Sequence, residues 1–301
     1  MSFRKIIYFI NPISGTKGKE RLIQLIKFRT SRENIPFEIL YTTKEGNYSF
    51  LQNKIAEEKI TDVIICGGDG TINKITSFLL NTPVNVGVIP MGSGNGLAFA
   101  AGISRNPTKA LDIIFKGKAK SVDGFFLNNH FSCMLSGLGF DAKVAYDFSQ
   151  QKKRGLFTYI LLSTKNFFTS KNYSFTIDVN EKKIHTKALF ISIANSNQFG
   201  NNVTIAPQAS LSDGLLDLVV VTKMNRLLTM FVLIKHLLQG KIEEHSDLMA
   251  GKKRVLYLQS KKITIQNPEL APLHIDGEPV DTEKNLEINV VENAFKLIQP
   301  S

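Results

Sequence analysis

Apolar and polar positions follow two different patterns along the chain, and the change comes near residue 121. In the first part, short apolar runs typical of buried strands alternate with segments whose apolar residues recur every three or four positions, as in helices. The predicted strands are 5–10, 37–41, 62–66 and 86–89, and the predicted helices are 19–28, 47–58, 71–80, 97–101 and 107–115. This alternation predicts a doubly wound α/β domain with a parallel sheet.

After residue 121, short strand-like runs dominate and tight turns separate several of them. The predicted strands are 121–127, 131–135, 173–179, 187–194, 215–221, 254–259, 263–266 and 286–291. This pattern predicts an antiparallel β-sandwich or barrel with helices near 157–168 and 227–239. We therefore expect an α/β domain over 1–121 and a β-rich domain over 122–291, with the closing run 292–301 a strand of either domain.

Composition narrows the class of protein. A chain of 301 residues with 43% hydrophobic and 21% charged residues fits two globular domains. No apolar run reaches the roughly 20 residues of a membrane span, and the N-terminus enters a strand pattern without a signal peptide. Two cysteines in apolar runs favour buried thiols in a reducing cytoplasm. A net charge of +11 favours anionic partners, but short, scattered basic clusters predict no nucleic-acid partner.

The run Gly67-Gly68-Asp69-Gly70-Thr71 follows a predicted strand and opens a predicted helix. Glycines lack a Cβ, so the backbone can turn sharply and approach a bulky anion. We expect Thr71 to cap the helix, whose N-terminus attracts phosphate. Asp69 repels a phosphate unless it holds Mg²⁺ or accepts a proton. The combination predicts phosphoryl transfer.

Two further loops follow strands of the same predicted sheet. In the first, at 11–18, the candidate phosphate-binding residues are Asn11, Ser14, Gly15, Thr16 and Lys17, with Lys19 as an alternative cation. This loop lacks the Gly-Lys-Ser/Thr ending of a Walker-type loop, so Mg²⁺ must be held elsewhere. Because the carboxyl ends of parallel strands lie at one edge of a sheet, we expect all the glycine loops to meet there.

The other loop is Pro90-Met91-Gly92-Ser93-Gly94-Asn95-Gly96. Gly92 and Gly94 let the backbone pass close to a nucleotide. Ser93 and Asn95 are expected to line the opposite wall of the phosphate site. The alternative interpretation of either loop is an ordinary turn between a strand and a helix.

With these loops in place, the chain resembles the catalytic family of diacylglycerol and sphingosine kinases, including its small bacterial lipid kinases. The motifs that carry the resemblance are Asn11-Pro12-Ile13-Ser14-Gly15, Gly67-Gly68-Asp69-Gly70-Thr71, Pro90-Met91-Gly92-Ser93-Gly94-Asn95, Leu211-Ser212-Asp213-Gly214-Leu215-Leu216-Asp217 and Asp276-Gly277-Glu278. The resemblance implies an N-terminal nucleotide-binding domain, a β-rich second domain, a cleft between them, ATP, Mg²⁺ and a lipid hydroxyl acceptor.

The second glycine loop departs from one branch of that family. Bacterial diacylglycerol kinases often have Asn-Asp where this chain has Asn95-Gly96, which looks closer to sphingosine and ceramide kinases. The reaction class is unaffected, but the acceptor stays open between a diacylglycerol and a sphingoid-type lipid.

The resemblance also assigns acids in the second domain. It implies that Glu278 returns to the phosphates, as a rival to Asp69 for the general base or as its partner through Mg²⁺. In some bacterial relatives, acids of the Asp213 motif hold a structural Mg²⁺; Asp213 matches best, and Asp217 falls within a strand pattern. The alternatives are a plain hairpin turn at Asp276-Gly277 and a turn followed by a strand at Asp213.

The sequence signals for lipid binding are less specific. Aromatic residues of the second domain are expected mainly in the core, while some line an acyl-chain pocket. The cluster Lys152-Lys153-Arg154 beside Phe157 suits docking on an anionic membrane, and Asp141 is a candidate contact for a polar headgroup. We expect a cytoplasmic enzyme bound peripherally to a membrane, with a homodimer left open.

Two other functions fit part of the pattern. NAD kinase and 6-phosphofructokinase also use a Gly-Gly-Asp-Gly-Thr loop, so a superfamily kinase acting on a soluble alcohol is the first alternative. A binding protein that kept the fold without activity is the second.

Overall fold

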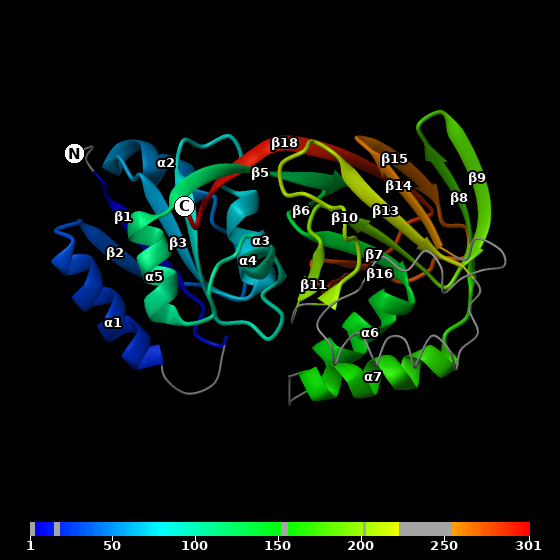
Figure 1. Cartoon of the computed structure of the whole chain (residues 1–301), viewed down its shortest axis with the longest axis horizontal. Coiled ribbons are helices and arrows are strands. Elements are labelled where there is room, and N and C mark those ends of the chain that lie inside the picture. The colour runs from blue at the N-terminus through cyan, green and yellow to red at the C-terminus, as the bar shows by residue number, and fades with distance from the viewer. Residues whose placement is uncertain (1–3, 15–18, 152–155, 201–202, 223–254) are drawn as a thin grey trace. The chain divides into compact units, whose positions relative to one another are not determined.

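Figure 1 shows a computed structural model of the chain, which describes residues 4–14, 19–151, 156–200, 203–222 and 255–301. The chain divides into two compact units, 1–122 with 293–301 and 123–292. Two strands run through the boundary: β5 (Lys118–Leu127) and the last strand, β18 (Asn285–Gln299). Each unit is described by itself.

The first unit is a parallel sheet with helices between its strands. The strands pair in the order β2-β1-β3-β4, and the end of β18 adds to β4 through Lys296 and Leu297. Their bounds are β1 (Ile6–Ile10), β2 (Phe37–Tyr41), β3 (Asp62–Gly67) and β4 (Asn85–Pro90). The helices are α1 (Lys19–Arg32), α2 (Phe50–Glu58), α3 (Asp69–Ser77), α4 (Gly96–Ala100) and α5 (Pro107–Lys116).

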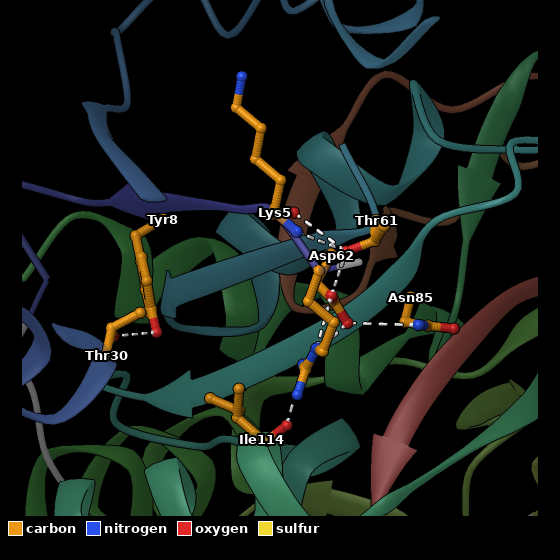
Figure 2. A network of polar contacts seen from close by, with 8 residues as sticks. Lys5, Tyr8, Thr30, Thr61, Asp62, Asn85 and Ile114 are labelled. Atoms are coloured by element: carbon orange, nitrogen blue, oxygen red, sulfur yellow. Dashed lines mark hydrogen bonds and ion pairs between the residues drawn. The ribbon is translucent and has the colours of Figure 1, made fainter. Parts of the chain in front are cut away.

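Helices cover both faces of this sheet because the side chains of β1, all buried, point alternately to either side. On one face, the Tyr8 hydroxyl lies 2.8 Å from the Thr30 hydroxyl of α1 (Figure 2), and α1 packs beside α5 (Figure 1). On the other face, the Phe9 ring meets Tyr48, just before α2, edge to face. The doubly wound α/β prediction is confirmed.

A polar network closes the amino edge of the sheet (Figure 2). Asp62, which is 1% exposed, accepts two 3.0 Å hydrogen bonds from Arg4 and further bonds from Thr61 and Asn85. Arg4 also donates to the Ile114 carbonyl oxygen in α5. A surface depression of about 990 Å³ lies beside this network. The strands end at the other edge, so the glycine loops lie away from it.

The second unit is a β-sandwich, as predicted. One sheet is antiparallel in the order β14-β13-β10-β7-β16-β17, and in the other β18 pairs with β15, β15 with β8 and β8 with β9. The bounds are β6 (His130–Ser132), β7 (Leu135–Gly139), β8 (Tyr173–Val179), β9 (Lys182–Ala188), β10 (Phe190–Ala194), β11 (Gln198–Gly200), β12 (Val203–Thr204), β13 (Leu216–Val221), β14 (Val255–Ser260), β15 (Lys262–Gln266), β16 (Leu273–Ile275) and β17 (Glu278–Val280).

The core of this unit lies between its two sheets. Ile177 and Ile265 from one sheet pack in the same cluster as Ile193 and Leu218 from the other. Two helices, α6 (Phe140–Ser149) and α7 (Leu156–Thr169), pack against each other, and α6 also contacts β7, β16 and β17 (Figure 1). In the part of the chain that the structure describes, no helix is both long and apolar enough to cross a bilayer.

Several elements differ from the sequence prediction. The predicted strand 131–135 is two strands, β6 and β7, and the predicted strand 187–194 is divided between the end of β9 and β10. Helix α6 and the strands β16 and β17 were not predicted, although a hairpin turn at Asp276-Gly277 was the alternative interpretation there. Thr71 was expected to cap a helix, but α3 begins at Asp69 with Gly68 at its N-cap, so the capping prediction was wrong. The predicted helix 227–239 lies outside the described residues.

Candidate active site

Asn11 joins the first loop to the second. Its backbone N–H donates to the Cys66 carbonyl oxygen at 3.0 Å, and its side-chain amide donates to the Thr71 hydroxyl at 2.7 Å. The carbonyl oxygen of the same side chain accepts from the backbone N–H groups of Ile13 and Ser14. Thr71 therefore holds the start of the first loop against the first turn of α3.

Two glycines bring the second and third loops into contact. A Cβ built on Gly68 would lie 2.9 Å from the Gly92 Cα, and one built on Gly92 would lie 2.6 Å from the Gly68 Cα. The Met91 N–H donates to the Gly67 carbonyl oxygen at 2.9 Å. Backbones approach this closely only where side chains are absent. Together with the Asn11 contact, this brings the three loops to one edge of the sheet.

Asp69 lies in the first turn of α3 and is partly exposed. Its carboxylate accepts hydrogen bonds from the backbone N–H groups of Gly96 at 3.1 Å and Leu97 at 3.4 Å. These are the first residues of α4, whose N-terminal N–H groups have no partner within the helix. The predicted catalytic acid therefore also anchors the third loop, so the second and third loops hold each other in place.

The side chain of Asn95 makes its hydrogen bonds within the third loop and does not face solvent. The residue is fully buried and has a left-handed backbone conformation with φ of 55°. Its side chain accepts from the Gly92 N–H and donates to the Gly92 carbonyl oxygen, both at 2.8 Å. Asn95 thus fixes the path of the backbone from Gly92 onward, which includes the partly exposed Ser93.

Three predicted phosphate-binding residues, Gly15, Thr16 and Lys17, lie outside the described residues. Of the remaining predicted residues, Gly67 ends β3 and leaves no room for a side chain, since a Cβ would lie 2.7 Å from the Thr71 side chain. Gly70 lies in the first turn of α3.

Glu278 is exposed at the start of β17 in the second unit. It follows the two-residue turn Asp276-Gly277, in which both residues have positive φ, 47° and 83°. This is the hairpin that the Asp-Gly pair favours. Asp276 is buried, and its carboxylate accepts from the Ser132 hydroxyl and from backbone N–H groups of residues 133–135.

The two predicted metal ligands differ in exposure. Asp213 is exposed, and its carboxylate accepts from the Leu215 N–H at 3.0 Å. Asp217 is buried in β13, where one carboxylate oxygen accepts from the Tyr257 hydroxyl and the Gln259 amide. Its other oxygen, Oδ2, is buried without a hydrogen-bond partner among the described residues. Burial raises the pKa of Asp217, and the charge of Asp213 acts in the same direction.

Among the described residues, no three His, Cys, Asp or Glu side chains form a cluster arranged to hold a metal ion. Magnesium ions in proteins usually keep several waters and take only one or two carboxylates. The buried oxygen of Asp217 is a suitable donor for such an ion, so the residues present fit Mg²⁺.

Sequence reasoning missed one buried acid, Asp123, and gave another, Asp141, a role at the lipid headgroup without predicting its burial. Asp123 accepts a 2.7 Å hydrogen bond from the Gly214 N–H and holds the loop of the Asp213 motif. Asp141, expected near a lipid headgroup, is 5% exposed, and its Oδ2 lies 3.4 Å from His274 Nε2. Asp123 and Asp141 both stand among apolar residues in the sequence, and this pattern is the signal that could have indicated their burial.

Two protein-family models match the chain. The model described as "Diacylglycerol kinase catalytic domain" matches residues 5–126, which include all three loops. The model described as "YegS C-terminal NAD kinase beta sandwich-like domain" matches residues 135–299, more than half of the chain. The chain belongs to the diacylglycerol kinase family. The family resemblance seen in the sequence is confirmed, and with it an enzyme of the lipid kinase type.

Named members of this diacylglycerol kinase family align with nearly the whole chain. The "Diacylglycerol kinase" of Bacillus subtilis (strain 168) is 27% identical, with 92% of this chain and 90% of the relative aligned. The "Probable lipid kinase YegS-like" of Chromohalobacter salexigens is 28% identical, over 86% of this chain and 82% of the relative. The crystal structure of a diacylglycerol kinase from Bacillus anthracis str. Sterne has the same fold, with a TM-score of 0.75 at 20% identity over 99% and 98% of the two chains.

Proposed function

We propose that the chain transfers the γ-phosphoryl group of Mg-ATP to the hydroxyl group of a diacylglycerol or sphingoid-type lipid. The meeting of three glycine-containing loops at the carboxyl edge of the sheet carries this proposal. Ligands bind at this edge in open α/β sheets. The N-terminus of α3, which lies in the second loop, favours phosphate. Relatives named as diacylglycerol or lipid kinases support the choice of acceptor.

Asp69 is the first candidate for the general base. A lipid hydroxyl becomes a good nucleophile when a carboxylate beside the γ-phosphate accepts its proton. The Gly96 and Leu97 N–H groups fix the direction of the Asp69 carboxylate and leave it partly exposed. Bound Mg²⁺ supplies charge neutralisation on the phosphates. Glu278 is the second candidate for the base: the family resemblance implies this role, and the residue is exposed on the hairpin of β16 and β17.

The test is phosphoryl transfer from Mg-[γ-³²P]ATP to diacylglycerol or sphingosine in detergent micelles. We expect labelled phospholipid with the wild-type protein. Asp69→Asn should lower kcat by about 100-fold or more, the usual contribution of general base catalysis. The control Glu57→Gln changes an exposed acid of α2 in the same unit and should leave kcat unchanged.

A substrate panel separates this function from the alternatives. Phosphate appearing on NAD and on no lipid would favour a kinase acting on a soluble alcohol. Tight binding of Mg-ATP, measured by calorimetry, without turnover on any acceptor would favour a binding protein. Undiminished kcat in Asp69→Asn would leave the lipid kinase function but remove Asp69 from the chemical step.

We also infer a structural Mg²⁺ at Asp213 and Asp217. The support is the buried Asp217 Oδ2, which has no hydrogen-bond partner in the described part of the chain, and the nearby negative charge of Asp213. Such an ion would be separate from the ion that accompanies ATP.

Finally, we infer that the enzyme acts on the cytoplasmic surface of an anionic membrane. Phe157 and Leu161 of α7 are 79% and 59% exposed. Within the sequence of α7, Lys165 is the one charged residue, and its charge is positive. Cys66 and Cys133 are free and buried, as suits cysteines in a reducing compartment.

A further inference from the structure

The hairpin that carries Glu278 is held from inside the second unit. Its two turn residues join β16 to β17, and Ile275 pairs with Glu278 across the turn. The buried Asp276 carboxylate fixes one side of the turn to residues 132–135. The other turn residue, Gly277, has a different support.

That support is a buried histidine. The Gly277 N–H donates to His274 Nδ1 at 3.2 Å, and His274 is 1% exposed. Since Nδ1 accepts this hydrogen bond, the N–H of the ring is at Nε2. Nε2 lies 3.4 Å from Asp141 Oδ2, in the first turn of α6. A chain of contacts therefore runs from Asp141 through His274 to the turn.

A missing side chain makes room for this pair. Gly137 of β7 lies directly opposite His274 of β16 in the sheet register, so the two residues share one face. A Cβ on Gly137 would lie 2.0 Å from Asp141 Oδ2 and 2.7 Å from His274 Nε2. Any residue other than glycine would separate the carboxylate from the ring.

We propose that His274, oriented by Asp141 in the space above Gly137, is a positioning residue that sets the direction of the Glu278 carboxylate. The ring holds the Gly277 N–H, the turn then fixes the first residue of β17, and Glu278 stands there exposed to solvent. A displacement of about 1 Å at a catalytic group can cost a hundredfold in rate. This inference rests on the proposed function, and within it on Glu278, the second candidate for the general base.

The test compares two substitutions of one residue. His274→Phe keeps the ring volume but loses both polar contacts, and it should lower kcat for lipid phosphorylation by 10-fold or more with KM for ATP within twofold. His274→Asn places an oxygen where Nδ1 was, so it should restore kcat to within about threefold of wild type. His185→Phe, at an exposed position of β9, is the matched control and should leave kcat unchanged.

Amide hydrogen exchange gives a readout that does not depend on activity. The Gly277 N–H should exchange faster in His274→Phe and at the wild-type rate in His274→Asn. Gly137→Ala, which keeps both polar side chains but pushes them apart, should behave like His274→Phe. If His274→Phe does not fold, the exchange rate of the Gly277 N–H in Gly137→Ala tests the proposal in its place.

The outcomes separate the two proposals. No phosphoryl transfer by the wild-type protein to any lipid would overturn the proposed function, and with it the role of the hairpin in catalysis. A wild-type rate in Glu278→Gln would remove Glu278 from the reaction and overturn the positioning role. Loss of activity in Glu278→Gln together with wild-type kcat in folded His274→Phe would overturn the inference alone.

Discussion

Gly92 is the residue at which the second and third glycine loops touch at the edge of the sheet. Its backbone touches that of Gly68, and its N–H and carbonyl groups are both held by the Asn95 side chain. The contact exists because neither glycine has a side chain. The relative placement of the second and third glycine loops therefore depends on Gly92 having only a hydrogen atom in place of a side chain.

We predict that Gly92→Ala weakens nucleotide binding. The new methyl group would lie 2.6 Å from the Gly68 Cα and 2.9 Å from Asn95 Oδ1, so the two loops must separate. Crowding of this kind typically costs about 1–3 kcal/mol. We expect the Kd for Mg-ATP, measured by calorimetry, to rise about 10-fold or more.

A control at an exposed site checks this interpretation. Ala56→Ser adds one heavy atom to an exposed residue of α2 in the same unit and should leave the Kd unchanged. If Gly92→Ala binds Mg-ATP as tightly as the wild type, the close contact of the loops is not needed for the nucleotide.

The sequence identified which residues form the glycine loops but not what their side chains do. Glycines next to strand ends are a local signal, so Gly67, Gly68 and Gly92 could be recognised. The bond from Asn11 to Thr71 spans 60 positions, and the inward direction of Asn95 depends on the fold of its loop. The Asp141–His274 pair spans 133 positions and forms because β7 pairs with β16. No local pattern contains such contacts.

At the scale of elements, long and strongly periodic segments were predictable and short ones with glycines were not. The strands and helices of the first unit appear where their apolar patterns placed them. By contrast, β7 reads Leu-Ser-Gly-Leu-Gly, and α6 begins after Gly139, whose φ is 91°. Glycines weaken a strand pattern and commonly mark turns, so the sequence favoured a loop there. Helix α6, which carries Asp141, and the short strands on either side of the Asp276-Gly277 turn are among the elements that were missed.

Strand β13 carries one acid among apolar neighbours, and this acid leads to a prediction about metal binding. Asp217 stands opposite Gln259 of β14 and has one buried oxygen without a hydrogen-bond partner among the described residues. A buried carboxylate oxygen of this kind costs free energy unless a cation or a proton meets it. We predict that Mg²⁺, without nucleotide, stabilises the wild-type protein.

Thermal unfolding measures this effect. At a Mg²⁺ concentration of about ten times Kd, binding contributes about 1.4 kcal/mol, or roughly 2–4 °C in Tm. Asp217→Asn and Asp213→Asn should each lose most of the shift, whereas Asp281→Asn, at an exposed position, should keep it. An equal shift in all four proteins would place the ion elsewhere.

For the whole molecule, the proposed membrane binding combines two features, the surplus of 37 basic over 26 acidic side chains and the exposed apolar side chains of α7. Positive charge attracts the protein to an anionic surface at long range, by about 1 kcal/mol for each Lys or Arg that comes near the lipid. Apolar side chains contribute only after contact, in proportion to the area that they bury. The two contributions differ in how they respond to salt, because screening weakens the first and leaves the second.

We therefore predict salt-dependent binding to anionic vesicles with a residual part that depends on α7. In sedimentation with vesicles, binding should be strong with phosphatidylglycerol present, weak with phosphatidylcholine alone, and reduced as salt rises from about 0.05 to 0.5 M. The double variant Phe157→Asp with Leu161→Asp should lose the binding that remains at high salt. Phe28→Asp is the control, since it changes a phenylalanine of α1 that is 59% exposed and should keep the residual binding. Equal binding to neutral and anionic vesicles would contradict the role of charge, and unchanged binding of the double variant would show that α7 does not touch the membrane.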